Sequence, residues 1–210
     1  MRPTLKRILV TAGPTRESLD PVRYLSNHST GEMGYAVARE ARRRGCQVTL
    51  ISGPVALKAP AGVEMVYISS ALELERACKK HFLLNDALVM SAAVCDFRPI
   101  SVSRQKMKRQ GQLCLTLKKS PDILATLAAR KKQQIIIGFC LETEHWLRRA
   151  RLKLIEKKLD GIVANRLSSR YSPFGDIKAD VAFLDRSSKE LIFETEDSPS
   201  KPEACERGSF

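Results

Sequence analysis

The chain has 210 residues, with 36 lysines and arginines against 23 aspartates and glutamates, which gives a formal net charge of +13. This length can bury the core of one domain, and the charge indicates anionic partners, either nucleic acid or phosphorylated small molecules. The sequence has no apolar run of about 18 residues and no secretory signal, so we expect no transmembrane helix and a cytoplasmic protein. Its six scattered cysteines lack zinc spacing and indicate free thiols.

Apolar strand-like segments alternate with helical segments along most of the chain. This alternation predicts an α/β fold built on a doubly wound, mostly parallel Rossmann-like sheet, with a final C-terminal hairpin. We expect residues 1–196 to form a single domain and residues 197–210 to form a disordered tail. The strands are predicted at 7–11, 47–52, 63–68, 87–91, 134–139, 161–164, 181–185 and 191–194, and the helices at 32–44, 71–84, 120–131 and 143–159.

One segment, residues 97–117, interrupts the alternation and is called the flap below. Its first part, residues 97–112, is polar and basic without a clear period, and residues 113–117 are predicted to form a short strand. We expect the flap to protrude from the core and to become ordered against a second copy of the chain.

The stretch 10–35 carries the densest set of candidate site residues. A strand ends in a turn at Gly13, and a long polar loop follows before Ser29 and Gly31 open a helix. Strand, small-residue turn and helix form the ligand crevice of doubly wound domains, where backbone N–H groups can bind phosphate. The glycines could equally serve only the turns and Ser29 only an N-cap, because the spacing is neither a P-loop nor GxGxxG.

Three motifs in order carry a family resemblance: TAGPTRESLDPVRYLSNHSTGEMG from residue 11, SAAVCDFRP from residue 91 and SPDILA from residue 120. They resemble the bacterial phosphopantothenoylcysteine synthetases, and the resemblance covers residues 4–185. It implies a nucleotide-binding ligase that joins 4′-phosphopantothenate to L-cysteine in coenzyme A biosynthesis. The implied reaction passes through an acyl-cytidylate, consumes CTP and releases CMP and pyrophosphate. The resemblance also implies a homodimer to which the flap contributes across the interface.

The resemblance assigns roles to individual positions. Asn27 matches an asparagine that assists conversion of the acyl-cytidylate to product, although it could instead cap the following turn. Lys106 matches the first lysine of a KIKK motif that contacts CTP. Gly13 and Ser29 are added as phosphate-binding candidates from the loop itself. The matched nucleotide-binding positions are Met90, Ser91, Ala92, Pro121, Asp122, Ile123, Leu124, Phe139, Lys153 and Lys157.

The residue types also suit this chemistry. Asp96 follows a central strand at the edge where ligands bind, and a carboxylate there suits the Mg²⁺ that we expect as cofactor, unless it caps a loop or pairs with Arg98. Lys106 lies in the basic flap, from which a mobile lysine can close onto a triphosphate, unless it is a solvated surface residue. Lys153 and Lys157 point from one helix face, which could equally be a solvated face.

The sequence also departs from the family pattern. Glu32 stands where the family has a lysine or another polar residue, and Ala179 in the segment 174–180 replaces an asparagine. A polar tail stands in place of the usual C-terminal helix. We expect a standalone synthetase without the flavin-dependent decarboxylase half, which leaves a separate decarboxylase as a candidate partner.

Two other functions stay open. The first is an NAD(P)- or flavin-related Rossmann-like oxidoreductase, but Ser52-Gly53-Pro54 follows the second strand where an acidic residue would hold the ribose. The second is a basic, non-catalytic nucleotide- or nucleic-acid-binding module. Seven Phe, four Tyr and one Trp form no aromatic-interleaved basic stripe, so no nucleic-acid partner and no membrane partner are expected.

Overall fold

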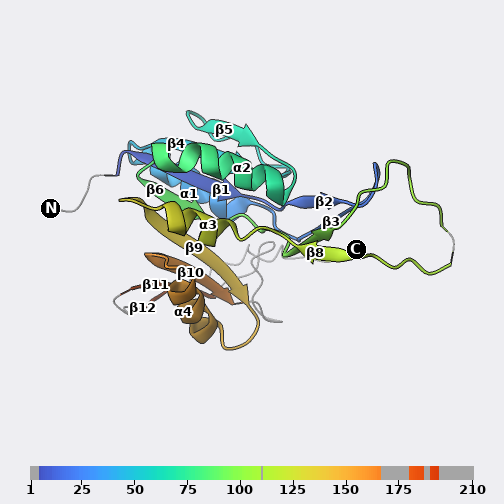
Figure 1. Ribbon diagram of the computed structural model, residues 1–210. Helices are drawn as coiled ribbons and strands as arrows, with labels where there is room; N and C mark the ends of the chain where they lie inside the picture. Colours follow the sequence, from blue (N-terminus) through green and yellow to red (C-terminus); the bar gives the residue numbers. More distant parts are fainter. Residues whose placement is uncertain (1–4, 110, 167–179, 187–189, 194–210) are drawn as a thin grey trace, which may run out of the picture.

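The computed structural model describes residues 5–109, 111–166, 180–186 and 190–193 (Figure 1). In this part of the chain, eight strands form one sheet in the order β12-β11-β10-β9-β6-β1-β4-β5, which confirms the predicted α/β architecture. The six strands from β10 to β5 are parallel, and β11 and β12 add an antiparallel hairpin at one edge. The strands are β1 (Arg7–Ala12), β4 (Gln47–Ser52), β5 (Glu64–Tyr67), β6 (Ala87–Met90), β9 (Ile135–Glu142), β10 (Gly161–Arg166), β11 (Asp180–Asp185) and β12 (Glu190–Phe193).

Helices cover both faces of the sheet because alternate strand residues point to opposite sides. Val10 packs with Tyr35 and Ala38 of α1 (Glu32–Arg43) on one face. Leu9 belongs to a second cluster on the other face, together with buried residues of α2, α3 and α4. These three helices span Ala71–His81, Ile123–Arg130 and Trp146–Glu156, and a short 3-10 helix, η1, continues α2 over Phe82–Leu84.

The strand order places a ligand crevice between β1 and β6. From β1 the chain crosses to β4 on one side of the sheet, and from β6 it crosses to β9 on the other. In such sheets the crossovers diverge at this point and leave an opening at the carboxyl ends of the two strands. The candidate residues that follow β1 and β6 therefore meet at one edge of the sheet.

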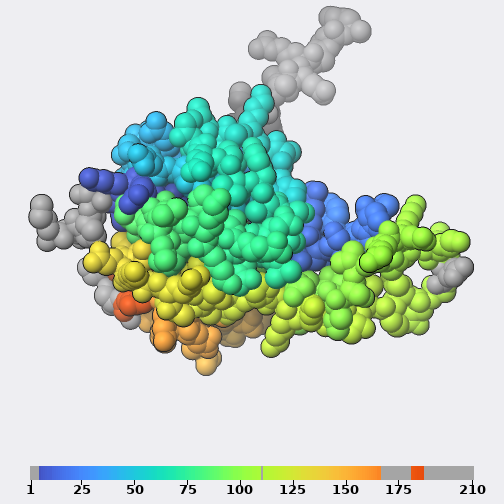
Figure 2. All heavy atoms as spheres, turned by 45° about the horizontal axis from the view of Figure 1, so that its top comes forward, coloured from blue at the N-terminus to red at the C-terminus, as the bar shows by residue number. Residues whose placement is uncertain are grey.

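Two small hairpins lie beyond this edge. The segment after β1, predicted as a long polar loop, contains β2 (Arg16–Ser18) paired with β3 (Tyr24–Ser26). At the base of the flap, β7 (Phe97–Pro99) pairs with β8 (Leu117–Lys119), so the predicted strand at 113–117 is wrong by most of its length. From this base the flap extends away from the body of the molecule (Figures 1 and 2). The pairing extends one hydrogen bond beyond Pro99, where the Ile100 N–H donates to the Thr116 carbonyl oxygen at 3.1 Å.

The start of α3 also differs from its prediction. We expected Pro121 in the first helical turn, but the helix begins at Ile123 and its N-cap is Asp122, whose carboxylate accepts a hydrogen bond from the Ala125 N–H at 3.0 Å. An aspartate at the N-cap satisfies a helix-end donor and complements the helix dipole, so it sets the start of the helix.

None of the described helices is long and apolar enough to cross a bilayer. The segment 174–179 with Ala179, the turn of the C-terminal hairpin and the tail at 197–210 lie outside the described residues.

Gly34 lets α1 approach the sheet closely. A Cβ on Gly34 would lie 2.5 Å from the Ala12 Cβ, 2.6 Å from the Ser91 Oγ and 2.9 Å from the Thr11 carbonyl oxygen. Two of these atoms belong to β1, and the third follows β6. We predict that Gly34→Ala lowers the free energy of unfolding by about 1–3 kcal/mol, because overpacking outweighs the gain in helix propensity of about 1 kcal/mol.

Chemical denaturation measures this loss. Ala36→Ser, on the exposed side of the same helix, is the matched control and should change the stability by less than about 0.5 kcal/mol. A Gly34→Ala protein as stable as the wild type would contradict the close approach of α1.

Candidate functional site

A first hollow of about 510 Å³ opens at the carboxyl edge of the sheet, between the segment after β6, the start of α3 and the side of α4. Candidate site residues that are far apart in the sequence line this hollow, because the carboxyl ends of the parallel strands lie at the same edge of the sheet. The candidate residues that line it are Met90, Ala92, Asp96, Pro121, Asp122, Ile123, Leu124, Phe139, Lys153 and Lys157.

A second hollow of about 460 Å³ adjoins the first, and Ala92, Val94, Phe139 and Lys153 line both. Its other side is the start of α1, where residues 31–34 line the space. The first backbone N–H groups of a helix lack partners within the helix and can bind a ligand. The candidates that line it are Asn27, Ser29, Ser91, Ala92, Phe139 and Lys153. The two hollows and their common wall can therefore hold two reactants side by side.

Two candidates line neither hollow. Gly13 lies underneath, at φ +75°, where a Cβ would come within 2.8 Å of Val55 and 3.3 Å of the Gly53 carbonyl oxygen. The positive φ and the close contacts of this tight turn therefore account for a glycine at position 13. Lys106 lies exposed on the flap, away from both hollows.

Lys153 of α4 and Lys157, the C-cap residue of this helix, both line the first hollow. Lys153 Nζ donates to the Phe139 carbonyl oxygen at 2.9 Å, and Lys157 forms an ion pair with Asp122. Burial alone would raise the pKa of Asp122, but the ion pair with Lys157 and the hydrogen bond from the Ala125 N–H hold it below its usual range. An anionic ligand can take over the role of this carboxylate, because the cation already faces the hollow.

Asp96 is exposed at the wall of the first hollow. It forms no ion pair with Arg98, whose buried Nε has no hydrogen-bond partner in the described part of the chain. Among the described residues, no cluster of three or more His, Cys, Asp or Glu side chains could hold a metal ion by itself. A single carboxylate fits Mg²⁺ only in the manner of nucleotide sites, where phosphate oxygens and water complete the shell.

Asn27 is fixed by a long-range contact. Its Nδ2 donates to the Ala93 carbonyl oxygen at 3.0 Å, across to the segment that follows β6. The alternative role as a cap of the next turn is not observed, since α1 has Gly31 as its N-cap, in a left-handed conformation with φ +83° and without a side-chain cap. The amide therefore stands at the rim of the second hollow, in reach of a bound reactant.

One residue of the site had no role in the sequence analysis. Asn165 lies near the carboxyl end of β10, lines the second hollow and is 8% exposed, and its Oδ1 has no hydrogen-bond partner in the described residues. A buried amide oxygen without a donor is uncommon, so this atom is available to a ligand donor. A polar residue at the carboxyl end of an apolar parallel strand is a signal that could have identified it.

The flap exposes more apolar surface than its basic composition indicated. Large apolar side chains along it are between 39% and 55% exposed, so the described part of the chain covers them only in part. They are Phe97, Ile100, Val102, Leu113, Leu115 and Leu117.

Comparison with known proteins decides the family. The family model of the DNA/pantothenate metabolism flavoprotein C-terminal domain matches residues 4–203. The chain belongs to this family. The family expected from the sequence motifs is thereby confirmed.

Relatives and solved structures agree with this membership. The coenzyme A biosynthesis bifunctional protein CoaBC of Vibrio parahaemolyticus is 46% identical over 167 residues, which cover 78% of this chain and 42% of the relative. The chain thus spans about two fifths of the length of the curated relatives of this kind. A crystal structure of the C-terminal domain of a CoaBC protein is 37% identical, with a TM-score of 0.76 over 90% of this chain and 85% of that domain.

A more distant structure supports the fold alone. A Cab2 mutant in complex with phosphopantothenate-cysteine is 17% identical, with a TM-score of 0.75 over 93% of this chain and 82% of that one.

The ion pair between Lys157 and Asp122 gives a test of the site of this family member. We predict that Lys157→Gln raises the pKa of Asp122, read from the ¹³C chemical shift of its carboxyl carbon. Because the folded pKa lies below the ordinary value of about 3.9, the pair stabilises the wild type above that pH, and this stabilisation is lost as the pH falls through the folded pKa.

Lys119→Gln is the control, because Lys119 lines the same hollow but pairs with no carboxylate of the described residues. An Asp122 pKa that responds equally to both substitutions would show that general charge, not the ion pair, lowers it.

Proposed function

We propose that this domain is a CTP-dependent phosphopantothenate–cysteine ligase of coenzyme A biosynthesis. The observation that carries the proposal is the pair of hollows at the switch point of the sheet, which share a wall and meet at Lys153. A ligase needs a nucleotide and an acyl substrate side by side, so that one reactive oxygen lies next to the α-phosphate. Family membership and the relatives named coenzyme A biosynthesis bifunctional protein support the same assignment.

In the first half-reaction, a carboxylate oxygen of 4′-phosphopantothenate attacks the α-phosphorus of CTP. A new P–O bond forms, the bond to the β-phosphate oxygen breaks, and pyrophosphate leaves with both electrons of that bond. We assign the first hollow to CTP, with Lys153 and Lys157 as its cations and with backbone N–H groups at the start of α3 as phosphate donors. Lys106 is assigned to the charge that develops on the departing phosphates.

In the second half-reaction, the amine of cysteine attacks the acyl carbon. A C–N bond forms, the bond between acyl carbon and phosphate oxygen breaks, and CMP leaves while the amine loses a proton. Asn27 does not ionise, and its Oδ1 has no partner in the described residues. It can therefore orient the acyl group or the amine without attacking the anhydride itself. The second hollow, which Asn27 lines, is assigned to phosphopantothenate.

A magnesium ion would be held by Asp96 together with phosphate oxygens. When bound, it would neutralise phosphate charge in the first hollow. Asp96 suits this role, because it is exposed at the wall of the first hollow and forms no ion pair with Arg98.

We also propose that the domain is a homodimer in which the flap takes part. The exposed apolar side chains along the flap support this, because a second copy would remove them from water. Lys106 lies on the flap and lines neither hollow of its own chain, so a site completed by a partner's flap is consistent with its assigned role. We propose a separate decarboxylase as a further candidate partner of this domain.

The oxidoreductase alternative is less well supported. At the end of β4, where a dinucleotide enzyme places a carboxylate for the ribose, Ser52 is 1% exposed. Its Oγ lies 3.0 Å from the Tyr35 hydroxyl and donates to the Gly53 carbonyl oxygen at 2.8 Å. The Ser52 side chain is thus held by contacts within the protein, and the residues that follow it, Gly53 and Pro54, carry no carboxylate.

The proposed nucleotide choice can be measured directly. With Mg²⁺ present, CTP should raise the melting temperature, whereas ATP, NAD and a short oligonucleotide should not. A ligand at a hundred times its Kd stabilises the folded state by about 2.7 kcal/mol, which such a scan resolves. Turnover with CTP should exceed turnover with ATP, and equal turnover with both would contradict the preference.

A second prediction separates the two half-reactions. Asn27→Ala should still release pyrophosphate from CTP but should accumulate phosphopantothenoyl-cytidylate, detected by mass spectrometry of the quenched mixture. Asn85→Ala is the matched control, since Asn85 Nδ2 also donates to a backbone carbonyl oxygen, that of His81 at 2.8 Å, but Asn85 lines neither hollow. If Asn27→Ala melts earlier yet completes turnover without the intermediate, Asn27 is structural, as expected for a lost contact of about 1 kcal/mol.

A further inference from the structure

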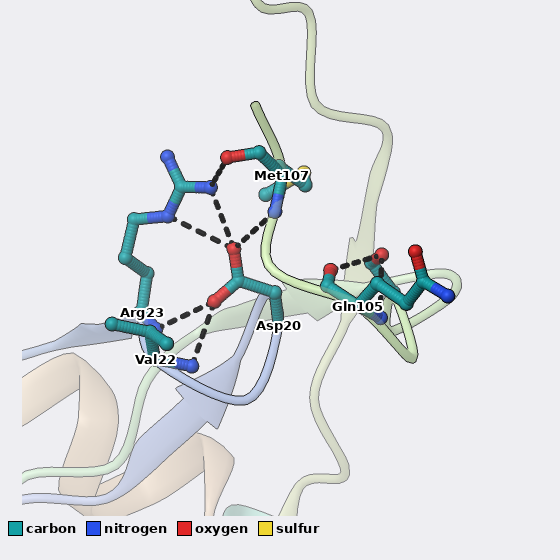
Figure 3. A network of polar contacts seen from close by, with 6 residues as sticks. Asp20, Val22, Arg23, Gln105 and Met107 are labelled. Carbon is teal, nitrogen blue, oxygen red and sulfur yellow. Dashed lines mark hydrogen bonds and ion pairs between the residues drawn. The ribbon is translucent and has the colours of Figure 1, made fainter. Parts of the chain in front are cut away.

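The turn between β2 and β3 contains a carboxylate without exposed surface. The Asp20 side chain is 0% exposed, and its Oδ1 accepts from the backbone N–H groups of Val22 and Arg23, both at 2.8 Å. Its Oδ2 accepts from Arg23 Nε and Nη2 at 2.9 and 2.6 Å and from the Met107 N–H at 3.1 Å (Figure 3). A carboxylate offers about four acceptor positions, so this one is fully occupied.

The last of these bonds reaches the flap and is one of several. The same guanidinium Nη2 donates to the Met107 carbonyl oxygen at 2.6 Å, and the Ser103 N–H donates to the Leu19 carbonyl oxygen at 2.9 Å. Ser103 Oγ also donates to the Gln105 carbonyl oxygen at 2.7 Å, which folds the loop on itself. Lys106 lies between two residues whose backbone is held in this way, and its own side chain is exposed.

We propose that Asp20 is a positioning residue for Lys106. Its carboxylate ties the loop 103–107 to the β2–β3 hairpin and thereby fixes the place from which Lys106 acts. The chemical part of this proposal rests on the proposed function, in which Lys106 meets the phosphates of CTP.

The hairpin is a suitable anchor because it is itself held to the sheet edge. Two residues past β3's start, Ser26 Oγ donates to the Thr15 carbonyl oxygen, and the next residue, Asn27, donates to the Ala93 carbonyl oxygen. One short hairpin therefore carries Asn27 at its end and the Lys106 loop at its turn. Both residues assigned to the reaction thus share a single support.

Only a carboxylate satisfies this arrangement. Backbone and guanidinium donors converge on both oxygens, so the NH₂ group of an amide would face donors in either orientation. Burial alone would raise the pKa of Asp20, but the hydrogen bonds from Val22, Met107 and Arg23 lower it well below its usual range. Asp20 therefore stays ionised at neutral pH and keeps the loop attached.

The first measurement is independent of activity. Hydrogen exchange at the Met107 amide should be about tenfold or more faster in Asp20→Asn than in the wild type. Glu40→Gln is the matched control: Glu40, like Asp20, forms ion pairs with arginine, in its case Arg43 and Arg44, but it lies on the exposed side of α1. This variant should leave Met107 exchange unchanged. Arg23→Lys keeps the positive charge but removes the two guanidinium N–H donors that bond to Asp20. This variant should also accelerate hydrogen exchange at Met107, and it replaces Asp20→Asn as the test if Asp20→Asn does not fold.

The second measurement is a double-mutant cycle on pyrophosphate release. Asp20→Asn should slow the first half-reaction by up to about a hundredfold, as misplacement of a reacting group can do. In a Lys106→Gln background the same substitution should have little further effect, because the residue it positions is already absent. A general loss of structure would instead give additive effects and slow the cysteine step as well.

The outcomes are distinct. Faster Met107 exchange with non-additive kinetics supports the proposal, and unchanged exchange or additive kinetics overturns it. A wild-type protein that releases no pyrophosphate from CTP would reject the proposed function, while the exchange experiment would still decide whether Asp20 holds the loop.

Discussion

The site depends on the pairing of two chain segments beyond the ends of β1 and β6. The Ala93 N–H donates to the Gly13 carbonyl oxygen at 2.9 Å, and the Thr15 N–H donates to the Ala93 carbonyl oxygen at 3.0 Å. These bonds continue the parallel pairing past the sheet, at the point where the crossovers diverge. Because Asn27 uses the same Ala93 oxygen, the loop after β1 and the segment after β6 form one rigid rim.

The cations of this rim are held before any ligand arrives. Lys153 donates to a backbone oxygen and Lys157 faces Asp122, so neither side chain has to be gathered from solvent. Held cations stabilise developing phosphate charge without reorganisation, which is how positioned electrostatic groups accelerate phosphate chemistry. The Asp122 carboxylate both pairs with Lys157 and caps α3, so it links this lysine to the start of α3.

The flap differs from this rim in how it is supported. Its base is the β7–β8 hairpin, and the loop 103–107 contacts the turn between β2 and β3. The flap protrudes from the body of the molecule (Figure 2). Its large apolar side chains are 39–55% exposed. Hydrogen bonds to a buried carboxylate can fix the loop 103–107 within the chain. The exposed apolar residues of the flap can be buried only by contact with another molecule.

The sequence alone determined the fold class, the family and most residues of the first hollow. Strand and helix periods are local, and long motifs such as SAAVCDFRP keep their order. Sequence could not place β2, β3 or β8, since three-residue strands carry no period and depend on their partners. Only the tertiary structure showed that Lys157 pairs with Asp122, that Asn27 reaches Ala93, and that Asp20 accepts a hydrogen bond from Met107 of the flap. Those contacts join residues 35, 66 and 87 positions apart, and folding alone brings them together.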